Sequence, residues 1–249
     1  MTEESEHKIT SHSLHFRMRN RLRSVIALAI IVFIPFGFMI WIRTHQSTGF
    51  ASVELILYPL LFGGGSIVIL YILKKYFLKE DLSDFNSKPG TWYNDLGWGV
   101  LLTIIYFVLF YLERMFLTDL LQFNPNLELL GLMLDMRDNP LLLILWFGPV
   151  LWIGIALYEE LIRVFILTTL WKWSDHVAWI ITVIFFASLI IGLAHWNQGS
   201  YGVVTITIKS LVACVFFYQK RRLMPLVYAH VLYDGLQVGM LLLTYPDKG

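Results

Sequence analysis

The sequence predicts an all-α protein, a polytopic bundle of transmembrane helices, and three observations carry this prediction. Of the 249 residues, 57% are hydrophobic. Only 15% are charged, whereas about a quarter are charged in a typical soluble domain. The apolar residues gather in runs long enough to cross a bilayer, which takes roughly 20 residues per helix. We therefore expect one transmembrane helical domain over residues 22–249, after a polar tail.

Seven main apolar segments are the expected spans. They cover residues 24–42, 53–77, 96–117, 140–171, 177–194, 203–219 and 224–244. The fourth segment is longer than one straight span requires, and Pro149 is expected to kink it. It is either one long tilted helix or two shorter helices, which gives about seven or eight spans in total. The connector around residues 125–138 is a candidate interfacial helix.

The distribution of lysine and arginine predicts the orientation in the membrane, because cytoplasmic loops are enriched in these residues. The tail over residues 1–21, the loop after the second span and the loop after the sixth span are basic. With seven spans, the amino terminus lies in the cytoplasm and the carboxyl terminus outside. We expect a multi-pass protein of the cell membrane in contact with the lipid bilayer. The net charge of +1 predicts no nucleic-acid partner.

Several features of the apolar segments have a structural interpretation. The stretch FGGGS at residues 62–66 is expected to allow close helix packing or a bend. Glu113 and Arg114 lie near a span end, where snorkelling explains them. Lys209 lies deeper and is expected to have a partner in the bundle or to snorkel. Cys214 lies in an apolar run and is expected to pack in the core.

A small group of ionisable residues lies inside the last apolar segments. The group consists of Glu159, Glu160, Arg163, His195, His230 and Asp234. Ionisable residues within a membrane are costly and indicate a functional site by default. Each of them alone also fits a structural pair. Together, two histidines and three carboxylates on three different spans can converge in one pocket.

Helical spacing predicts two contacts within this group. Glu159 and Arg163 lie about 40° apart around a helix, and Glu160 lies about 60° from Arg163. Arg163 can therefore hold one glutamate ionised while the other faces a cavity. The four-residue spacing of His230 and Asp234 lets the carboxylate orient the imidazole.

These residue types suit the hydrolysis of an amide by water, without a covalent intermediate. A buried glutamate beside a histidine can take a proton from water, and a second histidine can donate hydrogen bonds to the developing oxyanion. The sequence contains no GxSxG, HExxH, P-loop or GxGxxG pattern. No cofactor is expected, although the glutamate, the histidines and the aspartate can also ligate zinc.

The residues also resemble a known family. The stretches EELIRVFIL, SLIIGLAH and AHVLYDGLQ follow one another on successive apolar segments. They are similar to the EExxxR, FxxxH and HxxxN or HxxxD pattern of the CAAX protease and bacteriocin-processing family of intramembrane proteases, which includes the type II CAAX prenyl endopeptidases. The resemblance covers about residues 140–245, which form the protease-like core.

The resemblance implies an intramembrane peptidase and a role for each residue of the pattern. Glu159 would be the general base that activates water, and His195 would share that water. His230 and Asp234 would bind the oxyanion. The second glutamate and the arginine of the first motif would support the site. The implied substrate is a membrane-embedded or membrane-associated peptide or protein.

Three positions depart from the family pattern. The first motif reads EExxR, one residue shorter, which rotates Arg163 by about 100° toward the first glutamate. If Arg163 clamps Glu159, Glu160 takes the role of the base. Ile191 stands where the family has phenylalanine, a minor change of packing. Asp234 must be protonated to donate to an oxyanion, or must act through its neighbouring histidine.

Two other classes of function remain open. A non-catalytic membrane scaffold or bacteriocin-immunity protein would keep the fold without the chemistry. A transporter would use the buried carboxylates for proton coupling, but the inverted repeats that such proteins carry are not visible in the sequence. Straight spans would also separate His195 from His230 by much of the bilayer, so the site requires tilted or broken helices.

Overall fold

The computed structural model describes residues 20–33, 37, 53–124 and 127–244. In these ranges the fold is all-α, as the sequence predicts. A first helix covers residues 20–33, so the predicted span over 24–42 lies only partly in the described part of the chain. Nearly all of the predicted basic tail over 1–21 lies outside it.

The later helices follow the predicted apolar segments closely. They are α2 (Glu54–Ile72), α3 (Trp92–Phe116), α4 (Leu127–Met136), α5 (Pro140–Leu145), α6 (Tyr158–Trp171), α7 (Val177–Leu193), α8 (Gly199–Lys220) and α9 (Met224–Thr244). Two π-helical segments, Leu73–Phe77 and Trp146–Leu157, continue α2 and join α5 to α6, and short 3-10 turns cover Leu82–Phe85 and Trp196–Gln198. The connector expected to be helical does form a helix, α4.

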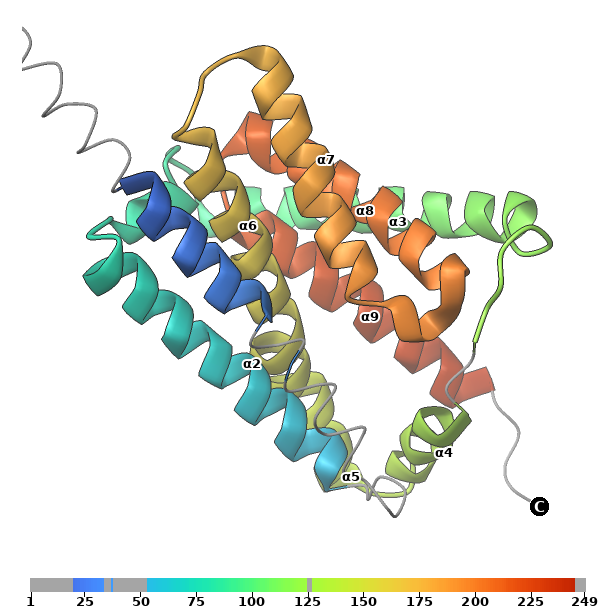
Figure 1. Cartoon of the computed structure of the whole chain (residues 1–249). Coiled ribbons are helices and arrows are strands. Elements are labelled where there is room, and N and C mark those ends of the chain that lie inside the picture. Colours follow the sequence, from blue (N-terminus) through green and yellow to red (C-terminus); the bar gives the residue numbers. More distant parts are fainter. Residues whose placement is uncertain (1–19, 34–36, 38–52, 125–126, 245–249) are drawn as a thin grey trace, which may run out of the picture.

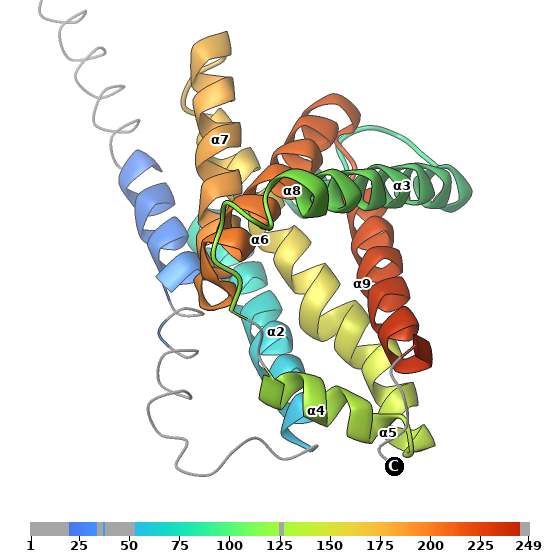
Figure 2. The ribbon, with the colours of Figure 1, turned by 90° about the vertical axis from the view of Figure 1, so that its right-hand side faces the viewer.

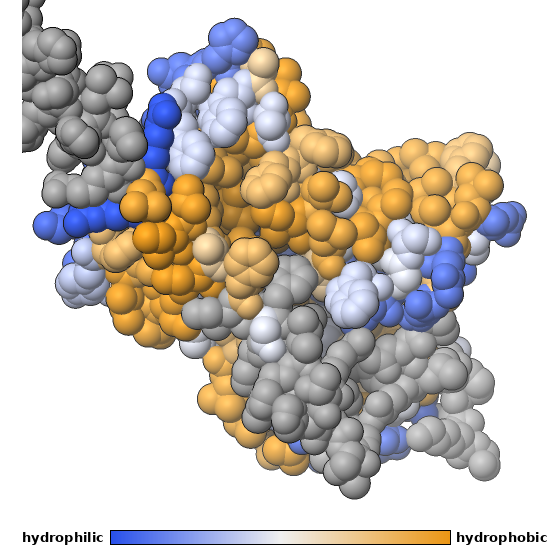
Figure 3. Space-filling view, in the orientation of Figure 1, coloured by the Kyte–Doolittle hydropathy of each residue, from blue (hydrophilic) through white to orange (hydrophobic). Residues whose placement is uncertain are grey.

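Five helical runs of the described residues are long and apolar enough to cross a membrane. They are Glu54–Phe77, Trp92–Phe116, Pro140–Trp171, Trp196–Lys220 and Met224–Thr244. The predicted fifth span corresponds to α7, a shorter apolar helix of 17 residues. Apolar side chains cover much of the molecular surface in Figure 3, as contact with lipid requires. The fold is that of an integral-membrane helical protein, and the total of seven or eight spans stays a prediction.

Helix α6 is the centre of the bundle. Every residue from Glu160 to Trp171 is buried. In Figures 1 and 2, α2 lies on one side of the long run that ends in α6, and α9 lies on the other. Helices α7 and α8 form a hairpin, and α3 is steeply inclined to α6 and α9 in Figure 2. The charged motif of α6 is therefore enclosed by helices that come from the whole described chain.

The long fourth segment is one helical run with a kink. Gly148 has φ −87° and ψ −109°, which is not a helical conformation, and Pro149 follows it. The proline ring disfavours the α conformation of the preceding residue and removes one backbone hydrogen bond. The kink predicted at Pro149 is thus confirmed, and the run Pro140–Trp171 continues through it as one candidate span.

Glycine in the stretch FGGGS allows α2 to approach the π-helical segment that precedes α6. A Cβ atom on Gly63 would lie 2.7 Å from the Cα atom of Gly154, and a Cβ atom on Gly154 would lie 2.8 Å from the carbonyl carbon of Pro59. Both distances are too short for real side chains. The close packing expected of this stretch is confirmed at Gly63.

The variant Gly63→Ala is expected to lower the free energy of unfolding by about 1–3 kcal/mol, the usual cost of overpacking. Gly64→Ala is the matched control, because among the described residues nothing lies within 4 Å of a Cβ atom there. Thermal unfolding of both variants in detergent measures the difference. Equal midpoints would show that the contact does not limit the packing of α2.

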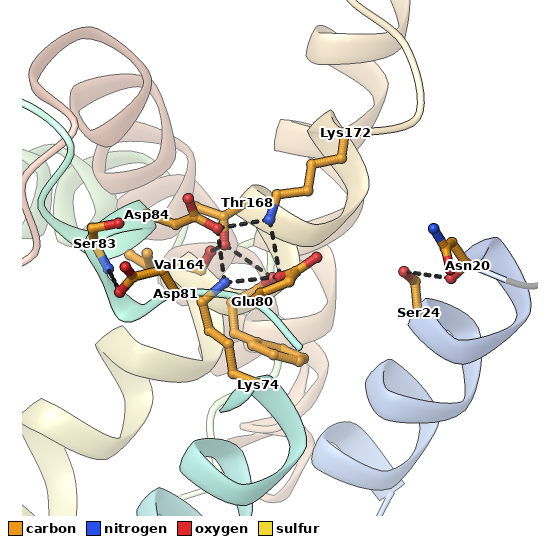
Figure 4. Close-up of polar contacts among 11 residues, drawn as sticks. Asn20, Ser24, Lys74, Glu80, Asp81, Ser83, Asp84, Val164, Thr168 and Lys172 are labelled. Atoms are coloured by element: carbon orange, nitrogen blue, oxygen red, sulfur yellow. Dashed lines mark hydrogen bonds and ion pairs between the residues drawn. The ribbon is translucent and has the colours of Figure 1, made fainter. Parts of the chain in front are cut away.

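Four charged side chains form ion pairs between the end of the α2 run and the end of α6 (Figure 4). Lys74 Nζ lies 2.9 Å from Glu80 Oε2 and 2.9 Å from Asp84 Oδ2. Lys172 Nζ lies 2.9 Å from the same oxygen of Glu80 and 2.7 Å from that of Asp84. Two cations and two carboxylates balance each other, so the buried Lys74 is neutralised where α2 leaves the bundle.

Two members of this network, Asp84 and Lys172, lie outside the spans, and their neighbours stabilise their charged forms. Partial burial alone would raise the pKa of Asp84, but hydrogen bonds from Lys172 and Lys74 hold it below its ordinary value of 3.8. Burial alone would lower the pKa of Lys172, but hydrogen bonds to Asp84 and Glu80 raise it above its ordinary value of 10.5. The contribution of Asp84 to stability is present above its ordinary pKa and is lost as the pH falls below it. The contribution of Lys172 is present below its ordinary pKa and is lost as the pH rises beyond it.

The variant Asp84→Asn is expected to lower the thermal midpoint at pH 7 by roughly 2–4 °C, because a partly exposed ion pair stabilises by at most about 1 kcal/mol. The difference from the wild type should shrink as the pH falls below about 4, the ordinary pKa of a free aspartate, and through the lowered pKa of Asp84. Asp175→Asn is the control, since this carboxylate is exposed. A difference that does not change with pH would contradict the assignment.

Candidate functional site

The first turns of α6 line a cavity of about 630 Å³ that is partly open to the outside. The cavity also touches α3, α8, α9 and the turn that follows α7. Its lining includes all six residues that the sequence singled out: Glu159, Glu160, Arg163, His195, His230 and Asp234. The predicted convergence of these residues is therefore observed, although their roles in chemistry are a separate question.

The depth problem expected for straight spans does not arise. His195 lies at the end of α7, which has only 17 residues, and His230 lies on α9. Both side chains line the same cavity. The separation that straight helices would impose is not a property of this fold.

Glu160 is held by two partners and is almost fully buried. Its Oε2 atom pairs with the guanidinium of Arg163, and its Oε1 atom lies 2.9 Å from His230 Nδ1. Arg163 Nε in turn donates to Ser210 Oγ over 3.1 Å. In the shortened EExxR motif the arginine thus clamps the second glutamate. The alternative in which Arg163 clamps Glu159 is not what the structure shows.

Glu159 faces the cavity instead. Its side chain is 24% exposed, against 3% for Glu160. The Oε2 atom lies 4.0 Å from His230 Nε2, beyond hydrogen-bond distance. Within the described part of the chain, no other group donates a hydrogen bond to this carboxylate. Glu159 is therefore able to bind water that enters the cavity.

His230 lies between two carboxylates. Its Nδ1 atom faces Glu160, and its Nε2 atom lies 3.2 Å from Asp234 Oδ2. Each ring nitrogen faces a carboxylate oxygen, which can only accept when it is ionised. The ring can donate to both carboxylates only when both nitrogens carry a proton, so this arrangement favours the imidazolium. The contact predicted between His230 and Asp234 is present, and the carboxylate orients the ring as expected.

His195 has a different environment. Its Nδ1 atom lies 2.9 Å from the carbonyl oxygen of Ile191. A carbonyl can only accept, so Nδ1 carries a proton, and in the neutral ring Nε2 keeps its lone pair. The residue that departs from the family pattern, Ile191, acts here through its backbone. The departure from phenylalanine therefore leaves this contact intact.

In the described ranges, no group of three or more histidine, cysteine, aspartate or glutamate side chains is arranged to hold a metal ion. The zinc alternative that the sequence left open thus gains no support from the geometry, and its test is chemical.

One charged pair of the cavity was not predicted. Glu113 was expected to snorkel at a span end, but it is only 4% exposed and pairs with Lys209. Both residues line the cavity. The snorkelling prediction is wrong for Glu113, whereas the partner expected for Lys209 in the bundle is confirmed. The available signal was the presence of opposite charges in two apolar segments, which the wide separation in sequence obscured.

The fold and the cavity define a class of protein: a polytopic membrane protein with a carboxylate–histidine site enclosed by its helices. A comparison with known families identifies the family. Residues 140–236 match the family described as "Rce1-like: Type II CAAX prenyl endopeptidase Rce1-like". The matched part of the chain contains every residue of the site on α6 to α9 and is similar to that family of CAAX proteases. Comparisons with curated proteins and with solved structures gave no match.

Proposed function

We propose that this protein is an intramembrane endopeptidase that hydrolyses a peptide bond of a membrane-associated peptide through a water activated by Glu159. The family match supports a CAAX-type protease in general. The observation that carries the finer proposal is the contrast between the two glutamates. Glu160 is occupied by Arg163 and His230, while the carboxylate of Glu159 faces the cavity.

The reaction follows from the positions of these groups. A water molecule donates one hydrogen bond to Glu159 and a second to Nε2 of His195. Glu159 takes a proton as the water oxygen attacks the peptide carbonyl carbon. The cationic ring of His230 stabilises the negative charge that develops on the carbonyl oxygen. The C–N bond then breaks, and the leaving amine receives the proton from Glu159.

The other residues of the site support these groups. Arg163 and Glu160 hold the ring of His230 from one side, and Asp234 holds it from the other. Because an ionised aspartate cannot donate a hydrogen bond, Asp234 contributes through His230 rather than by direct contact with the oxyanion. The negative charge of Glu160, held by Arg163, stabilises the cationic ring of His230 inside an apolar bundle.

The substrate that we propose is a peptide bound to the membrane, and the first candidate is a prenylated carboxyl-terminal peptide of the CAAX type, which the family name indicates. Apolar residues such as Trp146, Ile155 and Val238 line the cavity beside the charged groups. A location in the cell membrane with the amino terminus in the cytoplasm is part of the proposal and rests on the basic loops.

The test is peptide cleavage by the purified protein in nanodiscs. The probes are a farnesylated CAAX peptide and a library of membrane peptides, with products identified by mass spectrometry. We expect cleavage at a defined bond, and loss of cleavage in His195→Ala and His230→Ala. Two results together would instead establish a non-catalytic scaffold or immunity protein. The purified, folded wild type would cut none of the peptides, and Glu159→Ala and Glu160→Ala would still complement a deletion in cells.

Removal of metal ions is expected to leave the activity unchanged within about twofold, because the proposed water is activated by a carboxylate and a histidine. The measurement is the cleavage rate after dialysis against a chelator. Loss of activity with full recovery on addition of zinc, but not of magnesium, would replace this mechanism by a metal-dependent one.

A further inference from the structure

A second buried ion pair lies in the same cavity and takes no part in the proposed reaction. Glu113 of α3 pairs with Lys209 of α8, and both side chains are largely buried. Ser210, the residue after Lys209, binds Arg163 of the site. The pair is therefore close to the reacting groups along α8, on the wall of the space in which a substrate would lie.

The hydrogen bonds of this pair are incomplete. Glu113 Oε1 is buried and has no hydrogen-bond partner among the described residues. An ammonium group has three donors, and the hydrogen bond of Lys209 Nζ among the described residues goes to Glu113. Lys209 also interacts electrostatically with Asp234, and the centroid of the Tyr233 ring lies 5.8 Å from Nζ. The pair thus keeps one free acceptor and at least one free donor.

The ion pair of Asp95, on α3, with Arg222 is an example of a buried pair with a purely structural role. Asp95 is buried, and both of its oxygens are occupied by Arg222: Nε donates to Oδ1 over 2.6 Å, and the other nitrogen of the fork pairs with Oδ2. Neither residue lines the cavity. Buried charges that serve packing alone are normally satisfied in this way, so the unsatisfied oxygen of Glu113 requires another explanation.

We propose that Glu113 and Lys209 bind the backbone of the substrate, which deepens the proposed function and rests on it. Lys209 donates to the carbonyl oxygen of one substrate residue, and Glu113 Oε1 accepts from the N–H of the same residue. In an extended chain these two groups lie on the same side of the residue, as in an antiparallel ladder. The pair is neutral as a whole. It is therefore better suited to bind the dipoles of a peptide backbone than to bind a free carboxylate or a free amine.

The experiment uses the farnesylated CAAX peptide with each backbone amide in turn N-methylated. In the wild type, methylation of one position is expected to lower kcat/KM by about 10- to 100-fold, the size of a hydrogen bond to a charged group. The loss should appear mainly in KM, because the contact exists before and during the reaction. In Glu113→Leu/Lys209→Met, that position should lose its special sensitivity.

Matched variants separate binding from folding. Asp95→Leu/Arg222→Met removes a structural pair whose carboxylate lies on α3, as that of Glu113 does. This variant should keep the wild-type methylation profile. Glu113→Gln has one acceptor oxygen in place of two, so it cannot serve Lys209 and the substrate N–H together and should weaken the sensitivity. Binding of the same peptides to the Glu159→Gln protein, with and without the double change, repeats the comparison without turnover.

The outcomes distinguish this inference from the function on which it rests. A single sensitive position that disappears in Glu113→Leu/Lys209→Met supports the subsite. If the wild type cleaves the peptide but the double variant has the same methylation profile, the inference is wrong and the protease assignment stands. If the sensitivity depends on a free carboxyl terminus, Lys209 binds an anion and the backbone subsite is wrong. If the wild type neither binds nor cleaves the peptide, both fail.

Discussion

Glu159→Gln is expected to reduce peptide hydrolysis by about 10²- to 10⁴-fold without a loss of stability. This range is typical of a lost general base. Glutamine has nearly the same shape as glutamate but cannot accept a proton from water, and Glu159 faces the cavity without a hydrogen-bond partner in the described part of the chain. The measurement is the single-turnover cleavage rate in nanodiscs.

The control for this prediction is Thr118, a cavity residue in the turn after α3. Thr118 donates to the carbonyl oxygen of Arg114 over 2.8 Å, and Thr118→Val should cleave at the wild-type rate. If Glu159→Gln keeps more than about a tenth of the wild-type rate, its contribution is smaller than that of a general base. The role of the base would then pass to Glu160.

Glu160→Gln is expected to lower the free energy of unfolding by about 3–5 kcal/mol, the usual effect of breaking a buried ion pair from one side. The change removes the charge that faces Arg163 and His230 and leaves a guanidinium in an apolar interior. Thermal and denaturant unfolding in detergent measures this loss. Activity should fall as well, but together with stability.

The comparison with Glu159→Gln makes the second prediction specific. Both variants exchange the same chemical group on adjacent residues, yet Glu159→Gln should change the free energy of unfolding by no more than about 0.5 kcal/mol, because this half-buried carboxylate has no ion-pair clamp to lose. Arg163→Met should destabilise to a degree similar to Glu160→Gln. Equal and small effects of all three variants would show that the clamp on Glu160 contributes little to the fold.

Much of the site was predictable from the sequence because its signals are local. The spacing of the glutamates and the arginine on one helix limits which pairs can form, and the four-residue spacing of His230 and Asp234 does the same on another. The kink before Pro149 is likewise a property of the proline and its neighbour. The order of the three motifs then identified the family that the comparison confirms.

The parts that could not be predicted depend on how helices lie in space. The helical angles of Glu159 and Glu160 allow Arg163 to reach either one, and only the position of α9, which brings His230 to Glu160, decides between them. The pair of Glu113 and Lys209 joins residues 96 positions apart. A span boundary drawn from hydropathy alone placed Glu113 at the membrane surface.

In the proposed reaction, a water activated by Glu159 breaks a peptide bond inside this cavity. The most direct measurement is cleavage of the farnesylated CAAX peptide and the membrane-peptide library in ¹⁸O-water, with wild type and Glu159→Gln compared by mass spectrometry. We expect a new carboxyl terminus that carries one ¹⁸O atom, formed by the wild type and nearly absent with Glu159→Gln. A product that forms equally in both proteins, or no product from a folded wild type that complements its deletion in cells, would contradict it.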